Sequence, residues 1–146
     1  MTLKVTSETG KLASVLIHLP GPEIDRMVPS MLGELLFDDI LFGSRAREEH
    51  RRFQQVLGYV SREVLDAQDL LAEVLDVPEQ RSAILDDLEA KLRWGPEVID
   101  CLRPFETGES LAAALVAGVE QAAGQARDRG APYCVAPLPN YFFQRD

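Results

Sequence analysis

The sequence predicts an α/β fold that is interrupted by a block of helices, and three observations lead to this class. Leu12–Leu19 is short and apolar with β-branched residues at its centre, which is typical of a strand buried on most of both faces. Ser44–Val60 repeats apolar residues every three or four positions, as an amphipathic helix does. Glu63–Leu65 then predicts a second strand, so that strand, helix and strand suggest a βαβ-like unit. From residue 69 onward the pattern becomes helical.

These patterns divide the chain into three parts. Residues 1–68 form a first α/β unit, residues 69–131 a helical insertion, and residues 132–146 a return strand followed by a proline-rich motif. Tyr133–Val135 is the expected return strand, and Glu120–Gly130 is small and polar, as expected for a mobile loop.

Local signals place the ends of several expected helices. Ser44 and Thr107 can each cap a helix N-terminus through a side-chain oxygen. Pro78 and Pro96 each occupy a plausible first helical position, where the missing N–H costs nothing. The helix that Thr107 starts is expected to run to Val119.

Composition restricts the class of partner. The chain has 146 residues, of which 46% are hydrophobic, so it can bury a sizeable core. A net charge of −9 argues against nucleic acid and against an anionic membrane surface. No apolar run reaches the roughly 18 residues of a membrane span, and the first residues lack the features of a signal peptide. A cytoplasmic protein is expected.

The sequence contains no recognisable motif for binding a metal or a cofactor. There is no glycine-rich phosphate loop and no cluster of metal ligands, so neither a metal nor an organic cofactor is expected. His18 and His50 lie on different expected elements. His18 is expected to be a strand histidine whose hydrogen bonds are satisfied and not a catalyst, and His50 is expected to pack on the buried face of its helix. Cys101 and Cys134 are widely separated, and two reduced, buried thiols are the default for a cytosolic protein.

Pro137–Asp146 combines an amide, aromatic rings, an arginine and a carboxylate within a few residues of two prolines. This combination suits a polar pocket floored by aromatic rings. If the segment is extended, one side of it presents Asn140, Phe142, Gln144 and Asp146. The alternative from local features alone is an edge strand with a solvated tail.

Ile24–Phe42 is an apolar segment that two adjacent acids, Asp38 and Asp39, interrupt. One interpretation is a surface helix whose acids are solvated. The other is a loop that packs over a site and becomes ordered when the site is filled.

Three stretches, taken in order, carry a resemblance to a known family. The first is Ser7–Leu12, which leads into a strand ending in His-Leu-Pro-Gly; the second is Glu34–Asp39, which reads Glu-Leu-Leu-Phe-Asp-Asp. The third is Pro137–Asn140 followed by Phe143 and Arg-Asp. Together they resemble the N-terminal part of bacterial arginine deiminase. The resemblance implies a pentein α/β propeller with an inserted helical domain.

The resemblance also implies the residues of a substrate site. Asn140 and Phe143 match positions that contact arginine, Asp146 matches the carboxylate that grips the guanidinium, and Leu36 matches a residue whose backbone faces the substrate. In the family, a cysteine thiolate attacks the guanidinium carbon, ammonia leaves, and water releases citrulline. Neither cysteine of this chain matches that nucleophile, and the catalytic histidine motif is also absent. No catalytic residue is therefore assigned.

The function implied is that of the N-terminal portion of an arginine deiminase, which hydrolyses L-arginine to L-citrulline and ammonia with a thiolate supplied by a C-terminal part. The expected partners are L-arginine and the remainder of the enzyme chain, or further copies of this chain. The chain alone is expected to be inactive and to expose apolar surface. The alternatives are a non-catalytic regulatory protein or another guanidine-modifying enzyme, an amidinotransferase or agmatine deiminase; the Glu-Leu-Leu-Phe-Asp-Asp run favours arginine deiminase.

Overall fold

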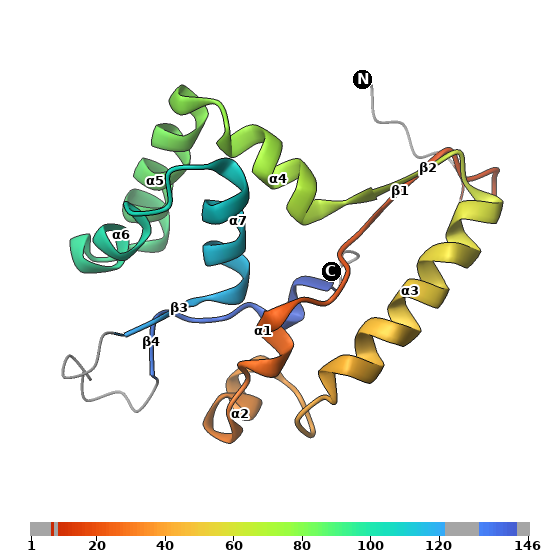
Figure 1. The fold of residues 1–146 in the computed structure, drawn as a ribbon, viewed down its shortest axis with the longest axis horizontal. Helices are drawn as coiled ribbons and strands as arrows, with labels where there is room; N and C mark the ends of the chain where they lie inside the picture. The colour runs from red at the N-terminus through yellow and green to blue at the C-terminus, as the bar shows by residue number, and fades with distance from the viewer. Residues whose placement is uncertain (1–6, 8, 122–131, 143–146) are drawn as a thin grey trace.

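A computed structural model describes residues 7, 9–121 and 132–142 (Figure 1). Its elements, in chain order, are β1 (Ser14–Ile17), α1 (Pro22–Asp25), η1 (Pro29–Met31), α2 (Leu32–Leu35), α3 (Gly43–Val60), β2 (Glu63–Asp66), α4 (Ala67–Leu75), α5 (Pro78–Leu92), α6 (Pro96–Leu102), α7 (Gly108–Ala117), β3 (Val119–Glu120), β4 (Tyr133–Val135) and η2 (Pro139–Phe142), where η marks a 3₁₀ helix. None of the described helices is long and apolar enough to cross a membrane.

The first half of the chain forms the predicted strand–helix–strand unit. Strands β1 and β2 pair in parallel, with Val15 opposite Val64 and Ile17 opposite Asp66. The crossover between them contains α3, which Figure 1 shows on the side of the strands away from α4–α7. The expected burial of β1 on both faces is wrong, because Leu16 is 45% exposed while Ile17 is buried. Within the described part of the chain, Leu16 therefore faces solvent.

The start of α3 differs from the prediction. The helix begins at Gly43, with Phe42 at the N-cap and no side-chain cap, so the expected capping role of Ser44 is wrong. A contact from another element holds this first turn. Arg47 Nη1 donates to Asp25 Oδ2 at 2.7 Å and to the carbonyl oxygen of Gly21 at 3.2 Å, which ties α3 to α1.

Much of the apolar face of α3 is open to solvent. The side chains with more than half of their surface exposed on this helix are Phe53, Val56, Tyr59 and Val60. Burying a large apolar side chain gains about 1.5–3 kcal/mol, so an uncovered face of this kind leaves stabilisation unused. The expected exposure of apolar surface is confirmed for the described residues.

The second half of the chain packs α4, α5, α6 and α7 around one core. Leu75, Leu102 and Leu111 are fully buried in it. The predicted positions of Pro78 and Pro96 at the start of α5 and α6 are confirmed. Thr107 also caps α7 as predicted: its hydroxyl oxygen accepts from Ser110 N, and Thr107 N donates in return to Ser110 Oγ.

Helix α7 ends earlier than predicted, because Gly118 turns the chain into β3. Gly118 has a φ of +78°, and a side chain there would lie 2.6 Å from the carbonyl oxygen of Val135. The prediction that Val119 continues the helix is therefore wrong; it pairs with Val135 across the antiparallel strands β3 and β4. Most of the expected mobile loop, residues 122–130, lies outside the described residues, although Glu120 is in β3.

The two cysteines form a disulfide, so the expectation of two reduced, buried thiols is wrong. Helix α6 packs against β4 and brings the Cα atoms of Cys101 and Cys134 to 6.7 Å. That separation is within the roughly 4.4–6.8 Å over which disulfides form. Both residues are also only half-buried. A separation of 33 residues gave no sequence signal for this pairing.

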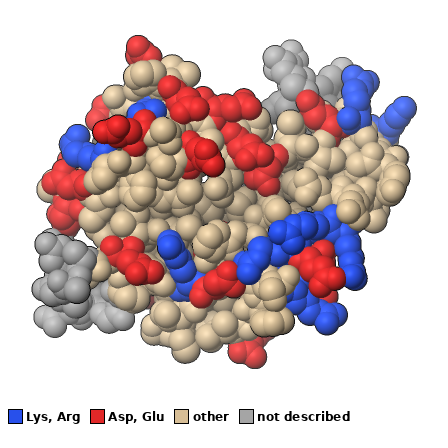
Figure 2. Space-filling model, in the orientation of Figure 1, with Lys and Arg blue, Asp and Glu red and all other residues tan. Residues whose placement is uncertain are grey.

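Charge is unevenly distributed between the two halves of the chain. Figure 2 shows acidic side chains spread over the face of the helical half and basic side chains collected along α3. The bases of α3 are Arg45, Arg47, Arg51 and Arg52. Exposed ion pairs between residues four positions apart, such as Arg45 with Glu49, occupy some of them and contribute about 1 kcal/mol or less each.

Candidate functional site

Two segments that carry predicted site residues lie against each other. Asn140 Nδ2 donates a hydrogen bond to the carbonyl oxygen of Leu35 at 3.0 Å, across 105 positions of sequence. Asn140 is in η2, not in an extended segment, so the expectation that Asn140 and Phe142 share one side of a strand is wrong. Two prolines precede the turn, and Tyr141 N donates to the carbonyl oxygen of Leu138 at 2.9 Å, which closes it.

Leu36 ends α2 in a left-handed conformation. Its φ is 58° and its ψ is 33°, and its side chain is 91% exposed. This conformation costs a residue other than glycine about 1–2 kcal/mol, and such strained residues often occur at functional sites. The turn leaves the Leu36 backbone beside the carbonyl group that Asn140 binds. Leu36 and Asn140 are thus brought together, while Phe143 and Asp146 lie outside the described residues.

Beneath η2, His18 lies between two carboxylates. His18 Nε2 is 3.2 Å from Glu23 Oε1, and His18 Nδ1 is 3.4 Å from Asp66 Oδ1. The parallel strands explain the second contact, because Ile17 pairs with Asp66 and His18 follows Ile17 directly. His18 and Glu23 are almost completely buried, at 2% and 0% exposure. The prediction of a histidine satisfied by hydrogen bonds is confirmed.

Backbone N–H groups fix both carboxylates. Asp66 accepts from Leu19 N and from Gln68 N, each at 2.8 Å, and the second of these bonds caps α4. Glu23 Oε1 accepts from Gly21 N at 2.5 Å. Glu23 Oε2 has no hydrogen-bond partner within the described ranges. Because the carboxylates are held by the backbone, the histidine between them has little freedom to move.

These surroundings change the proton affinity of His18. Burial lowers its pKa, but the hydrogen bond and charge of Glu23, together with Asp66, outweigh burial and raise the pKa above 6.5. Burial, followed by the charge of Asp66, raises the pKa of Tyr141. His50 behaves differently: burial, and then the charge of His18, lower its pKa.

The aromatic ring of Tyr141 connects this cluster to the turn. The ring centroids of His18 and Tyr141 are 4.6 Å apart, and the planes meet at 60°, an edge-to-face arrangement. Tyr141 follows Asn140 directly in η2. The ring of His18 therefore contacts the residue next to Asn140, whose side-chain amide binds Leu35.

Sequence reasoning missed Glu23, Asp66 and Tyr141. The five-residue spacing of His18 and Glu23 fits neither helix nor strand periodicity. One signal was present for Asp66: parallel pairing of the two expected strands brings their C-terminal ends together, and polar residues stand at both ends.

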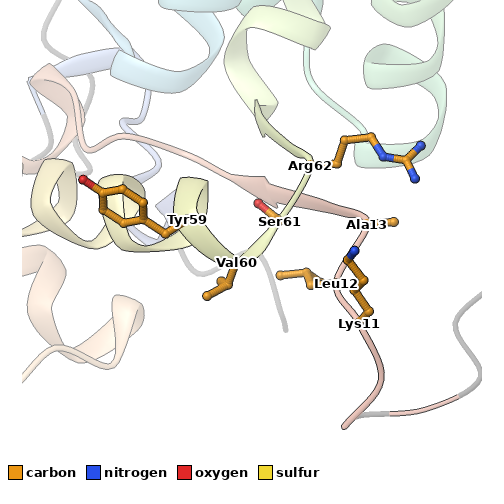
Figure 3. A pocket seen from close by; sticks show the side chains of 7 residues that line it. All are labelled: Lys11, Leu12, Ala13, Tyr59, Val60, Ser61 and Arg62. Atoms are coloured by element: carbon orange, nitrogen blue, oxygen red, sulfur yellow. The ribbon is translucent and has the colours of Figure 1, made fainter.

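A surface pocket lies at the opposite end of the two strands (Figure 3). It is lined by Lys11–Ala13, which precede β1, and by Tyr59–Arg62, which precede β2. No predicted site residue lines it. In Figure 3 the polar ends of Tyr59 and Arg62 point away from each other, so the junction of Asn140 with the Leu35–Leu36 segment is the better candidate for a functional site.

Comparison with known proteins gives the family of this chain. The structure defines an α/β protein whose closing turn contacts a strained loop above a buried histidine–carboxylate cluster. Residues 33–146 match the arginine deiminase family, so this chain belongs to that family. It is 37% identical over 160 residues to an arginine deiminase of Streptococcus pyogenes serotype M49 (strain NZ131), and 36% identical to one of Streptococcus equi subsp. zooepidemicus (strain MGCS10565). Each match covers 99% of this chain and 39% of the relative, so the chain spans well under half of their length.

Proposed function

We propose that this chain forms the arginine-binding N-terminal portion of an arginine deiminase, which converts L-arginine and water to L-citrulline and ammonia. Family membership and the Asn140–Leu35 contact support the proposal, and the contact carries it. Two segments that match substrate-facing parts of the family lie far apart in sequence, and this hydrogen bond joins them.

In the proposed site, Asp146 accepts two parallel N–H bonds from the planar guanidinium. Asn140 and Phe143 contact the substrate, and Leu36 faces it with its backbone. A cysteine thiolate from another part of the enzyme attacks the guanidinium carbon, ammonia leaves, and water releases citrulline. Cys101 and Cys134 do not take this role, because their sulfur atoms are bonded to each other.

We also propose the larger architecture that the family implies. Residues 1–68 form the first unit of a pentein propeller, residues 69–131 an inserted helical domain, and residues 132–146 the return to the site. The exposed apolar face of α3 supports this arrangement, since further parts of the enzyme chain or another copy can cover it. A cytoplasmic location stays a prediction.

A hybrid enzyme tests the proposed function. It joins this chain to the part of Streptococcus pyogenes arginine deiminase that the chain does not match. We expect the hybrid to release citrulline from arginine and to leave agmatine unchanged, which separates an arginine deiminase from an agmatine deiminase. The streptococcal part alone is the control. A folded hybrid that gives no citrulline would contradict the proposal.

The isolated 146-residue chain should produce no citrulline, because it supplies no free thiolate at the site. The measurement is a citrulline assay on purified protein with millimolar arginine. Activity that disappears in Cys101→Ser or Cys134→Ser would instead make one of these cysteines the nucleophile and overturn the assignment of roles.

The segment Ile24–Phe42 should become ordered over bound arginine. The structure anchors its beginning, since Ile24 is fully buried, and leaves its end open, with Phe42 76% exposed. Amide hydrogen exchange in the hybrid should therefore slow with arginine in the second half of the segment, around Asp38 and Asp39, more than near Ile24. Exchange that is already slow there, and unchanged by arginine, would exclude a closing loop.

A further inference from the structure

The cluster under η2 has no part in the proposed reaction, yet it is among the most deeply buried polar groups of the described chain. Each ring nitrogen of His18 faces a carboxylate oxygen. An ionised carboxylate only accepts hydrogen bonds, and a neutral imidazole has one N–H to donate. Both contacts can be hydrogen bonds only when the ring is an imidazolium. The geometry therefore favours a charged His18.

We propose that His18, held between Glu23 and Asp66, is a positioning residue for the arginine-binding turn, which it supports through the ring of Tyr141. The proposal rests on the proposed function, because that function makes η2 part of a substrate site. When His18 is held by both carboxylates, its ring gives Tyr141 one fixed surface. Tyr141 in turn fixes the neighbouring Asn140 against the carbonyl group of Leu35.

Loss of the proton should loosen the turn. A neutral His18 has a lone pair facing one of the two carboxylates, and it repels that group in a site from which water is excluded. The ring must then shift, and the edge-to-face contact with Tyr141 shifts with it. A histidine at the surface would lose its proton and be solvated by water without moving its neighbours. His18 is buried, so a shift of its ring also displaces Tyr141.

The titratable groups around His18 in the described residues set the direction of the pH effect. Burial opposes the charged ring, and Glu23 from α1 and Asp66 from β2 outweigh it. The pKa of His50 from α3 is lowered by burial and then by the charge of His18, and the pKa of Tyr141 from η2 is raised by burial, so that Tyr141 is neutral at physiological pH. The pKa of His18 is raised in the folded chain. The stabilisation is thus fully present below pH 6.5 and is lost as the pH rises through the folded-state pKa.

The test is a titration of the 146-residue chain followed by nuclear magnetic resonance. The chain has two histidines and three tyrosines, so their ring signals can be assigned by substitution. We expect the Tyr141 ring and the Asn140 side-chain amide to change with the same midpoint as His18, above pH 6.5. Tyr59, which is 89% exposed, should show no such change and serves as the internal control. Signals of Tyr141 and Asn140 that stay constant while His18 titrates would overturn the proposal.

Two variants sharpen the test. Glu23→Gln should lower the midpoint of His18 and move the Tyr141 curve with it, whereas His50→Gln should leave the two curves coincident. Curves that separate in Glu23→Gln would overturn the proposal. If Glu23→Gln does not fold, the titration of the unaltered chain still shows whether Tyr141 and Asn140 follow the protonation of His18. The titration contains no arginine, so a failure of the hybrid enzyme to use arginine would contradict the proposed function without altering this result.

Discussion

Asp146→Asn in the hybrid enzyme is expected to lower kcat/KM for arginine by about a thousandfold. The substitution keeps the size of the side chain but removes its charge and directs an N–H donor at the donors of the guanidinium. Removing one partner of a buried charged pair costs about 3–5 kcal/mol, and about 1.4 kcal/mol corresponds to a factor of ten. Steady-state kinetics with arginine measure the change.

Asn140→Ala in the same enzyme is the matched control, and it should cost less because the contact that it removes is neutral. Both variants need a circular dichroism spectrum and an unfolding midpoint close to those of the unaltered hybrid. A loss below about tenfold in folded Asp146→Asn would mean that this carboxylate is solvated and does not hold the guanidinium.

Gly108→Ala is expected to produce the largest change in stability among single-methyl substitutions. Helices α4 and α7 meet at this residue, where Gly108 N donates to Asp76 Oδ1 at 2.6 Å. An added Cβ would lie 2.0 Å from the carbonyl oxygen of Ala72 and 2.7 Å from Asp76 N, both backbone atoms. The helices must separate, so the free energy of unfolding should fall by about 3 kcal/mol. Denaturant unfolding measures it.

Gly58→Ala provides the comparison for that experiment, because it makes the same chemical change in open space. Gly58 lies in α3, and nothing is within 4 Å of its added Cβ. Alanine is the better helix former, so this variant should be more stable by about 0.5–1 kcal/mol. Equal effects at the two glycines would show that α4 and α7 do not approach as closely as the structure indicates.

Local chemistry explains which parts of the fold could be predicted. Short apolar runs and a helical apolar pattern predicted the two strands and the crossover helix, and Pro78, Pro96 and Thr107 marked helix starts through their own backbone or side-chain chemistry. The predicted helix ends are wrong where contacts with a distant segment of the chain determine them. At Gly43, where α3 starts, an added Cβ would lie 2.0 Å from Asp25 Oδ1 of α1, and α7 stops where Gly118 meets β4.

The candidate site shows the same division. The motifs predicted Leu36 and Asn140 as site residues, and the structure brings the segments that carry them together; their roles stay predictions, as do those of Phe143 and Asp146. For the histidine–carboxylate cluster, the sequence held a signal only for Asp66, at the paired strand ends, and none for Glu23, which comes from a short helix. Their proximity depends on strand register, and that is a property of the folded chain.

The disulfide has a topological consequence for the most buried helix. Cys101 lies in α6 and Cys134 in β4, so the bond closes a covalent ring that contains the whole of α7. A single break in the polypeptide anywhere within that ring leaves one molecule whose two pieces stay joined. Helix α7 then stays attached to the core through the side that is not cut, and the two pieces separate only when a reductant opens the disulfide.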